Sequence, residues 1–222
     1  AYLPAQEINN GVVKIAVIEG QYGKVIVRNP THLSNRLVEN QLEGINSGDA
    51  ITSVPLEHRL LLLSDIAGVK INSTLAPGAT VGTSDLIVDV APAARVNGSI
   101  DADNAGNRYA GESRLGATIN LNNVAGRGDV ASLRLLTSAE GLNYARAAYQ
   151  LQVDKATVGA AYSWLEYELG EEFTSRDASG DAKIASVYGR YPLMRSRNNN
   201  FYADIFYENK VLQDKIGIAN TV

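Results

Sequence analysis

The chain has 222 residues, of which 45% are hydrophobic and 20% are charged, and its formal net charge is −4. This balance excludes a disordered segment, and an acidic chain without a basic, aromatic-rich stripe argues against a nucleic-acid partner. The sequence contains no cysteine, so it predicts no disulfide.

Residues 1–20 are predicted to contain a strand. The segment Gly11–Gly20 is rich in β-branched residues and is bounded by glycines, which is typical of a strand. A single strand is not stable by itself. We therefore expect residues 1–20 to hold the terminal strand of a domain that begins upstream.

Residues 21–91 are predicted to form a small α+β domain. Two segments carry helix start signals, since Ser34 can cap the first helix and Pro55 stands in the first turn of the second. The expected elements are a strand at Lys24–Arg28, helices at Ser34–Leu42 and Pro55–Ser64, and strands at Val69–Leu75 and Asp85–Val90. The order βααββ is typical of an α+β unit with its helices on one face of a sheet.

Residues 92–222 are predicted to be all β-structure. In Gly111–Leu121, small or apolar residues alternate with polar ones, which is the pattern of a strand with one apolar and one polar face. The longest apolar run, Leu60–Leu63, is far shorter than the roughly 20 residues of a membrane helix, so any membrane passage must be made by strands. The expected strands are Arg95–Asp103, Tyr109–Asn122, Asp129–Thr137, Leu142–Val153, Ala156–Leu169, Lys183–Pro192 and Phe201–Leu212.

The connections and the aromatic residues favour a transmembrane barrel. Asn123–Asp129 and Ser138–Gly141 are tight turns, whereas Gly170–Asp181 is a long polar loop, and such alternation is typical of outer-membrane barrels. We expect Gly170–Asp181 to face the cell exterior. Aromatic residues near strand ends would form girdles at the membrane interface, or would instead pack on half-buried strands. They are Tyr162, Trp164, Tyr167, Tyr188, Tyr191, Phe201, Tyr202, Phe206 and Tyr207.

Four motifs, in chain order, resemble those of one protein family. The βααββ unit ends in Pro77-Gly78 and in Gly82–Val90. Asp103–Arg114 resembles an opening barrel hairpin, Asn123–Asp129 the next turn, and Tyr191–Tyr202, with its Tyr-Pro-Leu-Met-Arg-Ser-Arg run, a later turn. Together they resemble the second polypeptide-transport-associated (POTRA) domain and the early barrel of two-partner secretion transporters, the hemolysin secretion/activation (ShlB/FhaC/HecB) family.

The resemblance implies a fragment of an outer-membrane transporter, with its POTRA region in the periplasm. Residues 1–20 would be the terminal strand of a first POTRA domain, 21–91 the second POTRA domain, and 92–222 the N-terminal part of a transmembrane β-barrel, about seven strands. The POTRA domains would capture an unfolded exoprotein, and the barrel would pass it to the cell surface. The partner would be a large secreted adhesin, hemolysin or contact-dependent toxin, and the barrel would contact outer-membrane lipid.

Two sets of residues are candidates for function. An exposed sheet edge can accept an extended client as an added strand, and the family topology implies that this edge is the second strand of the unit. The candidate client-binding residues are Val69, Lys70, Ile71, Asn72, Ser73, Thr74 and Leu75. Because a charge facing lipid at mid-depth costs about 2–4 kcal/mol, polar barrel residues are expected to face the lumen. The candidate lumen-facing residues are Glu112, Arg114, Asn120 and Arg134, with Arg146 or Gln150.

The sequence predicts no enzyme. His32 and His58 lack a nucleophile in a recognisable catalytic arrangement, and the glutamates of 166–172 lack the spacing of a calcium loop. We therefore expect no catalytic residue, no metal site, no cofactor and no small-molecule substrate. Arg127-Gly128-Asp129 spells an adhesion tripeptide but is ordinary turn chemistry. Two other functions stay open: a BamA-like outer-membrane assembly factor, and a soluble β-rich binding module whose strands close a sandwich.

Overall fold

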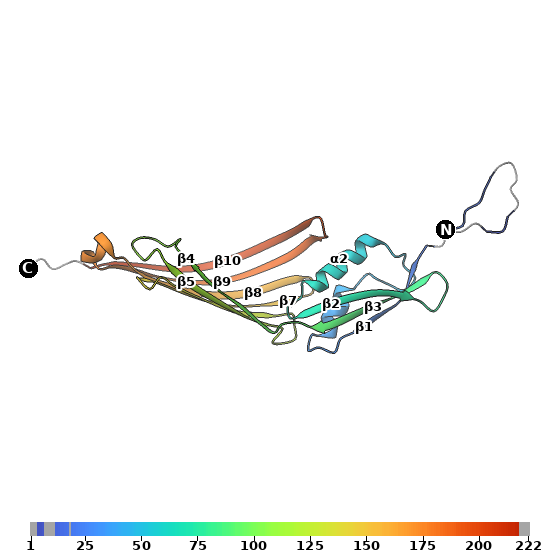
Figure 1. Cartoon of the computed structure of the whole chain (residues 1–222), viewed down its shortest axis with the longest axis horizontal. Coiled ribbons are helices and arrows are strands. Elements are labelled where there is room, and N and C mark those ends of the chain that lie inside the picture. The colour runs from blue at the N-terminus through green and yellow to red at the C-terminus, as the bar shows by residue number, and fades with distance from the viewer. Residues whose placement is uncertain (1–3, 7–11, 18, 218–222) are drawn as a thin grey trace, which may run out of the picture.

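The computed structural model describes residues 4–6, 12–17 and 19–217. Two parts follow one another along the long axis (Figure 1): an α/β unit, residues 21–92, and an open sheet, residues 96–216, which we call the long sheet. Within the residues described, no helix has the length and apolar character needed to cross a membrane.

The α/β unit has the predicted element order. Its elements are β1 (Gln21–Arg28), α1 (Asn35–Gln41), α2 (Ser53–Ser64), β2 (Val69–Pro77) and β3 (Thr83–Pro92). The strand order is β1-β3-β2, with β1 parallel and β2 antiparallel to β3. The helices pack on one face of this sheet, and the hydrophobic core lies between them. Its fully buried aliphatic side chains include Val38, Leu63, Leu86, Val88 and Val90.

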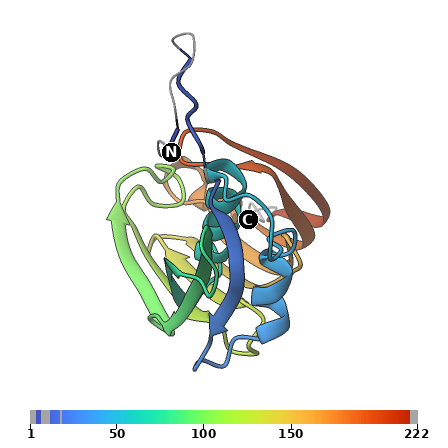
Figure 2. The same ribbon diagram turned by 90° about the vertical axis from the view of Figure 1, so that its right-hand side faces the viewer.

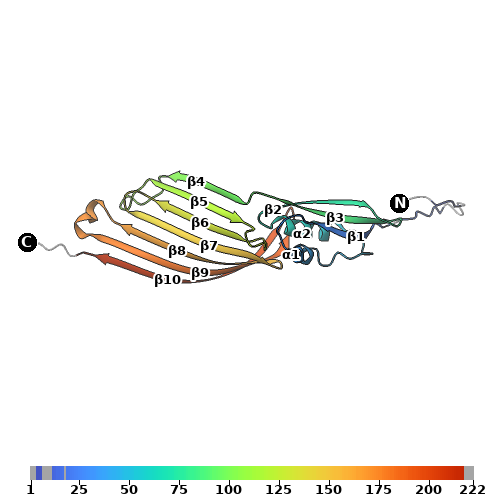
Figure 3. The ribbon, with the colours of Figure 1, turned by 90° about the horizontal axis from the view of Figure 1, so that it is seen from below.

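The long sheet has seven strands, each paired antiparallel with its neighbours in the chain. The strands are β4 (Val96–Asp103), β5 (Arg114–Asn122), β6 (Val130–Thr137), β7 (Leu142–Val153), β8 (Ala156–Glu168), β9 (Ala178–Arg195) and β10 (Asn200–Ile216). All seven overlap the predicted segments. Figure 3 shows the strands side by side in this order, with the β5–β6, β7–β8 and β9–β10 turns next to the α/β unit.

The two faces of the long sheet differ in polarity, and the apolar face is the more exposed. On β5, Leu115, Ile119 and Leu121 are 54%, 46% and 41% exposed. The residues between them point to the other face, where Thr118 and Asn120 bond to polar side chains of neighbouring strands. Seen along its length, the sheet curves like part of a cylinder (Figure 2). A soluble sheet hides its apolar face, so this polarity is the reverse of the soluble arrangement.

Two predicted strands differ from what the structure shows. Of the described residues in Gly11–Gly20, none lies in a strand, and only Val12 and Ala16 are bridge residues. A strand needs a neighbouring strand to be stable. The predicted strand at Tyr109–Asn122 begins only at Arg114. Gly111 has a φ of +97° and its Cα lies against Ser138, so the backbone there turns and does not extend.

The Gly170–Asp181 segment is more ordered than predicted. It contains a 3₁₀ helix, η1 (Glu171–Arg176), and β9 begins at Ala178, after one intervening residue. The small polar residues Ser179 and Gly180 are accommodated in β9 because it pairs with both β8 and β10. The remaining loop is therefore shorter than the sequence indicated.

The aromatic residues near the strand ends are divided between the two faces of the long sheet. Tyr162, Tyr191 and Tyr207 lie on the exposed apolar face. By contrast, Tyr167 donates a hydrogen bond to Asp214 (2.7 Å) and Tyr188 donates one to Gln150 (3.2 Å), both on the polar face. Because successive side chains of a strand point to opposite faces of the sheet, aromatic residues that are close in sequence are divided between the two faces.

Candidate functional site

Strand β2, which contains the candidate client-binding residues, lies at an edge of the sheet of the α/β unit. Two backbone hydrogen bonds flank its ladder with β3. The N–H of Ala93 donates to the carbonyl of Gly68 (3.1 Å), and the N–H of Gly78 donates to that of Thr83 (2.9 Å). The register between them has no bulge. Because hydrogen-bonded pairs alternate with non-hydrogen-bonded pairs along antiparallel strands, these two bonds fix which β2 residues bond to β3.

The alternation divides the seven candidate residues into two groups. Lys70, Asn72 and Thr74 direct their backbone N–H and C=O to β3. The backbone N–H and C=O groups directed to the open edge belong to Val69, Ile71, Ser73 and Leu75. Pro77 has the same parity as this second group, and a proline is tolerated there because no N–H is needed for the ladder. Only alternate residues of the predicted site therefore offer main-chain groups to a client.

The opposite edge of this sheet is partly covered. At the start of β1, the N–H of Tyr22 donates to the carbonyl of Asp49 (2.9 Å), and the N–H of Gly48 donates to the carbonyl of Tyr22 (2.8 Å). The segment between α1 and α2 therefore protects this end of β1. Among the residues described, β2 is the more accessible edge for an added strand.

The two ends of β2 differ in burial. Val69 is buried and Ile71 packs against the core, so the beginning of the strand is held by the helices. Ser73, Thr74 and Leu75 are exposed. The second half of β2 thus combines free backbone groups with accessible side chains.

On the polar face of the long sheet, charged side chains from different strands form pairs. The guanidinium of Arg134 donates to both oxygens of Asp101 (3.0 and 2.9 Å), and Arg114 donates to Asp103 (2.8 Å). Asn120 donates to Asn97 (2.9 Å). These pairs connect β4 to β5 and β6, so three of the predicted lumen residues share one face.

The structure separates the other lumen candidates. Arg146 donates to Ser163 (3.2 Å), and Gln150 accepts from Tyr188, so both lie on the polar face with Arg134. The sequence alone does not decide between these two residues. Glu112 precedes β5 and lies in the β4–β5 connection, so strand alternation assigns it to neither face.

The β5–β6 turn, residues 123–129, is built around the carboxylate of Asp129. This fully buried side chain accepts hydrogen bonds from the backbone N–H groups of Val124 (3.1 Å), Ala125 (3.0 Å) and Arg127 (3.1 Å). Burial raises the pKa of Asp129, but the backbone donors outweigh it and hold the pKa below its usual value. Since Asp129 is buried, the adhesion tripeptide is not displayed.

This turn also contacts the α/β unit. The carbonyl of Gly126 accepts a hydrogen bond from the N–H of Ser34 (2.9 Å). Gly128 (φ +61°) lies so close to Ile66 that a Cβ there would be 2.7 Å from its side chain. Glycine is therefore required at this position by both the backbone conformation and the close approach.

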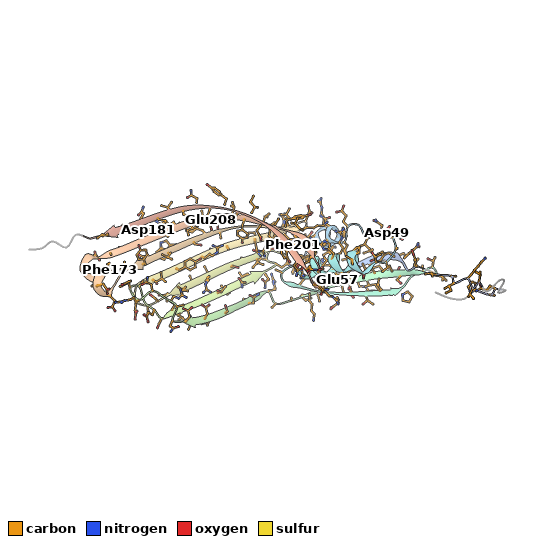
Figure 4. All side chains as sticks on the ribbon, turned by 90° about the horizontal axis from the view of Figure 1, so that it is seen from above. Asp49, Glu57, Phe173, Asp181, Phe201 and Glu208 are labelled. Carbon is orange, nitrogen blue, oxygen red and sulfur yellow. The ribbon has the colours of Figure 1, made fainter. Side chains whose placement is uncertain are left out.

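A second contact joins α2 to the β9–β10 turn, residues 196–199. Arg195 donates two hydrogen bonds to the carboxylate of Asp65 (2.7 and 2.9 Å), and Nδ1 of His58 donates to the carbonyl of Arg195 (3.0 Å). Glu57 accepts from the N–H of Arg197 (2.9 Å). Figure 4 shows Glu57 on α2 and Phe201 on β10 where the two parts meet. We call the contacts of these two turns with the α/β unit the joint.

Sequence analysis identified the turns of the joint but not the roles of their residues. Asp129 closes a Gly-rich turn, which was interpreted as ordinary turn chemistry, and Arg195 lies in the Tyr191–Tyr202 motif. The sequence indicates no catalytic role for His58, but it does not predict the contact of this side chain with Arg195. The signal in the sequence was an aspartate, Asp129, at the end of a Gly-rich turn. The residues of the α/β unit that this turn contacts lie far away in the sequence, so the contact could not be predicted.

The chain is similar to a known family and to solved structures. The model of the family "Haemolysin secretion/activation protein ShlB/FhaC/HecB" matches residues 82–216. The heme/hemopexin transporter protein HuxB of Haemophilus influenzae is 32% identical over 219 residues, 97% of this chain and 39% of HuxB. The outer membrane transporter CdiB of Escherichia coli strain 536 is 24% identical over 173 residues, 75% of this chain and 29% of CdiB.

Among solved structures, CdiB from Escherichia coli aligns with a TM-score of 0.71 at 19% identity, over 97% of this chain and 41% of that one. This likeness shows a common fold. The chain spans about two fifths of the length of HuxB. Because the family model covers most of the chain, from β3 to β10, the chain belongs to the haemolysin secretion/activation protein family ShlB/FhaC/HecB.

Proposed function

We propose that this chain is part of a two-partner secretion transporter, which captures an unfolded exoprotein in the periplasm and passes it through the outer membrane to the cell surface. The observation that supports this most is the polarity of the long sheet. Its exposed face is apolar and its inner face carries ion pairs. That is the arrangement of a barrel wall between lipid and a polar lumen, and it disfavours a soluble sandwich.

We propose that the α/β unit is a POTRA domain on the periplasmic side. In this division residues 1–20 end a first POTRA domain, 21–91 form the second, and 92–222 begin the barrel. The turns next to the α/β unit, such as 154–155 between β7 and β8, are short, whereas the β4–β5 and β8–β9 connections at the other end are longer. Outer-membrane barrels have short periplasmic turns and longer outer loops.

The proposed partner is a large secreted exoprotein. HuxB is described as a heme/hemopexin transporter and CdiB as an outer membrane transporter. Each is much longer than this chain, so transport requires the rest of the protein. Within this chain, we propose that the client pairs with the open edge of β2 through the backbone groups of Ile71, Ser73 and Leu75.

A single proline tests this contact. The complete gene is expressed with the gene of its partner in a Gram-negative host, and secreted partner is measured in the medium. Ser73→Pro removes an N–H that faces the open edge while leaving the ladder with β3 intact. Loss of one backbone hydrogen bond to the client should lower secretion by about threefold to tenfold.

Ser73→Ala is the matched control, because it keeps the N–H, and its secretion should equal wild type. Normal secretion by Ser73→Pro at wild-type protein level would refute the edge contact. Transport itself is tested by deletion of the gene. If the partner reaches the medium without it, the transporter proposal is wrong.

A further inference from the structure

A hollow of about 390 Å³ lies where the joint meets the exposed face of the long sheet. It is lined by residues of α1, of the β5–β6 turn and of the β7–β8 turn. They are Ser34, Arg36, Leu37, Asn40, Arg127, Leu151, Gln152, Val153 and Asp154. Its volume falls within the range of ligand pockets in proteins.

Two guanidinium groups line this hollow without a partner among the described residues. Arg36, on α1, and Arg127, in the β5–β6 turn, are both exposed. Within the part of the chain that the structure describes, neither side chain makes an ion pair or a hydrogen bond, whereas Arg114, Arg134 and Arg195 are all paired. Two arginines that line one concave site favour a phosphate, which accepts several N–H donors at once.

The hollow also contains one carboxylate, from Asp154. Its Oδ1 accepts a hydrogen bond from Asn40 (2.7 Å), and its backbone carbonyl accepts one from Gln41. Among the described residues, none donates to Oδ2. The charges lining the site are therefore two positive and one negative, with a free acceptor on the negative group.

Leu151 and Val153 connect the hollow to the apolar face. They have the same strand parity as Tyr149, which lies on the exposed side of β7, and Val153 is 47% exposed. If the long sheet spans the membrane, as proposed above, its apolar face ends at this point. A molecule in the hollow would then have its polar group between the arginines and its apolar part along β7.

We propose that the hollow binds the head group of a glycerophospholipid from the periplasmic leaflet. The phosphate lies between Arg36 and Arg127, and a primary ammonium of the head group donates to Asp154. The lipid that carries both groups is phosphatidylethanolamine. Such a lipid would connect α1 to the barrel wall at the joint.

Native mass spectrometry of the complete gene product, extracted in mild detergent, tests this proposal. Wild-type protein should retain one phosphatidylethanolamine beyond the loosely bound lipids. The double variant Arg36→Gln, Arg127→Gln should retain it at least about tenfold less, because two charged hydrogen-bond donors are lost. Arg197→Gln is the matched control, since it removes a cation at another turn of the same sheet end, outside the hollow.

Exchange into nanodiscs distinguishes the head groups. Phosphatidylcholine, which has no N–H donor, should bind more weakly than phosphatidylethanolamine, and Asp154→Asn should remove that difference. Equal retention by the double variant and the wild type would overturn the site. A preference for phosphatidylglycerol that persists in Asp154→Asn would overturn the ammonium contact. If the protein retains no lipid in any form, the membrane assignment itself fails, which is a separate outcome.

Discussion

Asp129 shows how one side chain can shape a turn. Its carboxylate is fully buried and accepts from the backbone N–H groups of Val124, Ala125 and Arg127. Asp129→Asn keeps the shape of the side chain but replaces one acceptor oxygen with an NH₂ that faces the backbone N–H donors of the turn. At least one of these buried donors then lacks an acceptor, so we expect the folded protein to lose about 1–3 kcal/mol of stability. Urea unfolding of the refolded protein in detergent measures this. Asp177→Asn, at an exposed position with a φ of 46°, should leave stability unchanged.

The lowered pKa of Asp129 predicts that the stability of the protein depends on pH. Since the folded-state pKa of Asp129 is lowered, its contribution to stability is present above the unfolded carboxyl pKa of about 3.9 and is lost as pH falls through the folded-state value. The difference in stability between wild type and Asp129→Asn should therefore be full at pH 7 and shrink in acid. Thermal unfolding measured from pH 7 down through the folded-state pKa of Asp129 reports this difference. A constant difference would show that the charge of Asp129 does not stabilise the turn.

At the scale of elements, the joint couples α2 to the β9–β10 turn. Arg195 and Asp65 form an ion pair with two hydrogen bonds, and the pair is partly exposed to solvent. We therefore expect a coupling energy of only about 0.5–1 kcal/mol in a double-mutant cycle with Asp65→Asn and Arg195→Gln. Glu57 and Arg197 provide a comparison in the same place. Their side chains are 3.9 Å apart and Arg197 is 81% exposed, so a cycle on them should give a coupling near zero. Equal couplings would contradict this ranking.

The elements themselves could be predicted from local patterns, because helix caps and period-two alternation act within a few residues. This is why α2 and all seven strands of the long sheet overlap the segments that the sequence predicts. The turn at Gly111 is not visible in a local pattern, because Gly111 packs against Ser138, which lies far along the chain. The joint escapes prediction for the same reason, because Arg195 and Asp65 are 130 positions apart.

At the scale of the whole molecule, the two parts bury their apolar residues in opposite ways. The α/β unit hides its apolar face under helices, whereas the long sheet exposes residues such as Ile100 (80%) and Ile205 (75%). An apolar surface this large on a soluble protein would promote aggregation. In a bilayer it is the stable arrangement, so the direction in which a side chain points should decide whether a charge is tolerated.

Two adjacent alanines in β7 test this directly. Ala147 points to the apolar face, because it pairs with the exposed Tyr162, and Ala148 points to the polar face, where it pairs with the buried Ala161. Ala147→Lys should destabilise the inserted protein by about 2–4 kcal/mol, since both residues are near the middle of the strand. Ala148→Lys should cost less than about 1 kcal/mol, mostly through repulsion from Arg146 on the same polar face.

The measurement is the folded fraction of the complete gene product after urea-driven refolding into lipid vesicles, followed by its mobility on an unheated gel. The two variants carry the same new charge one position apart, so effects on net charge, strand propensity and expression are matched. A clear loss for Ala147→Lys alone confirms that the apolar face meets lipid. Equal tolerance of both lysines would mean that water reaches both faces, and the long sheet would then not be a barrel wall.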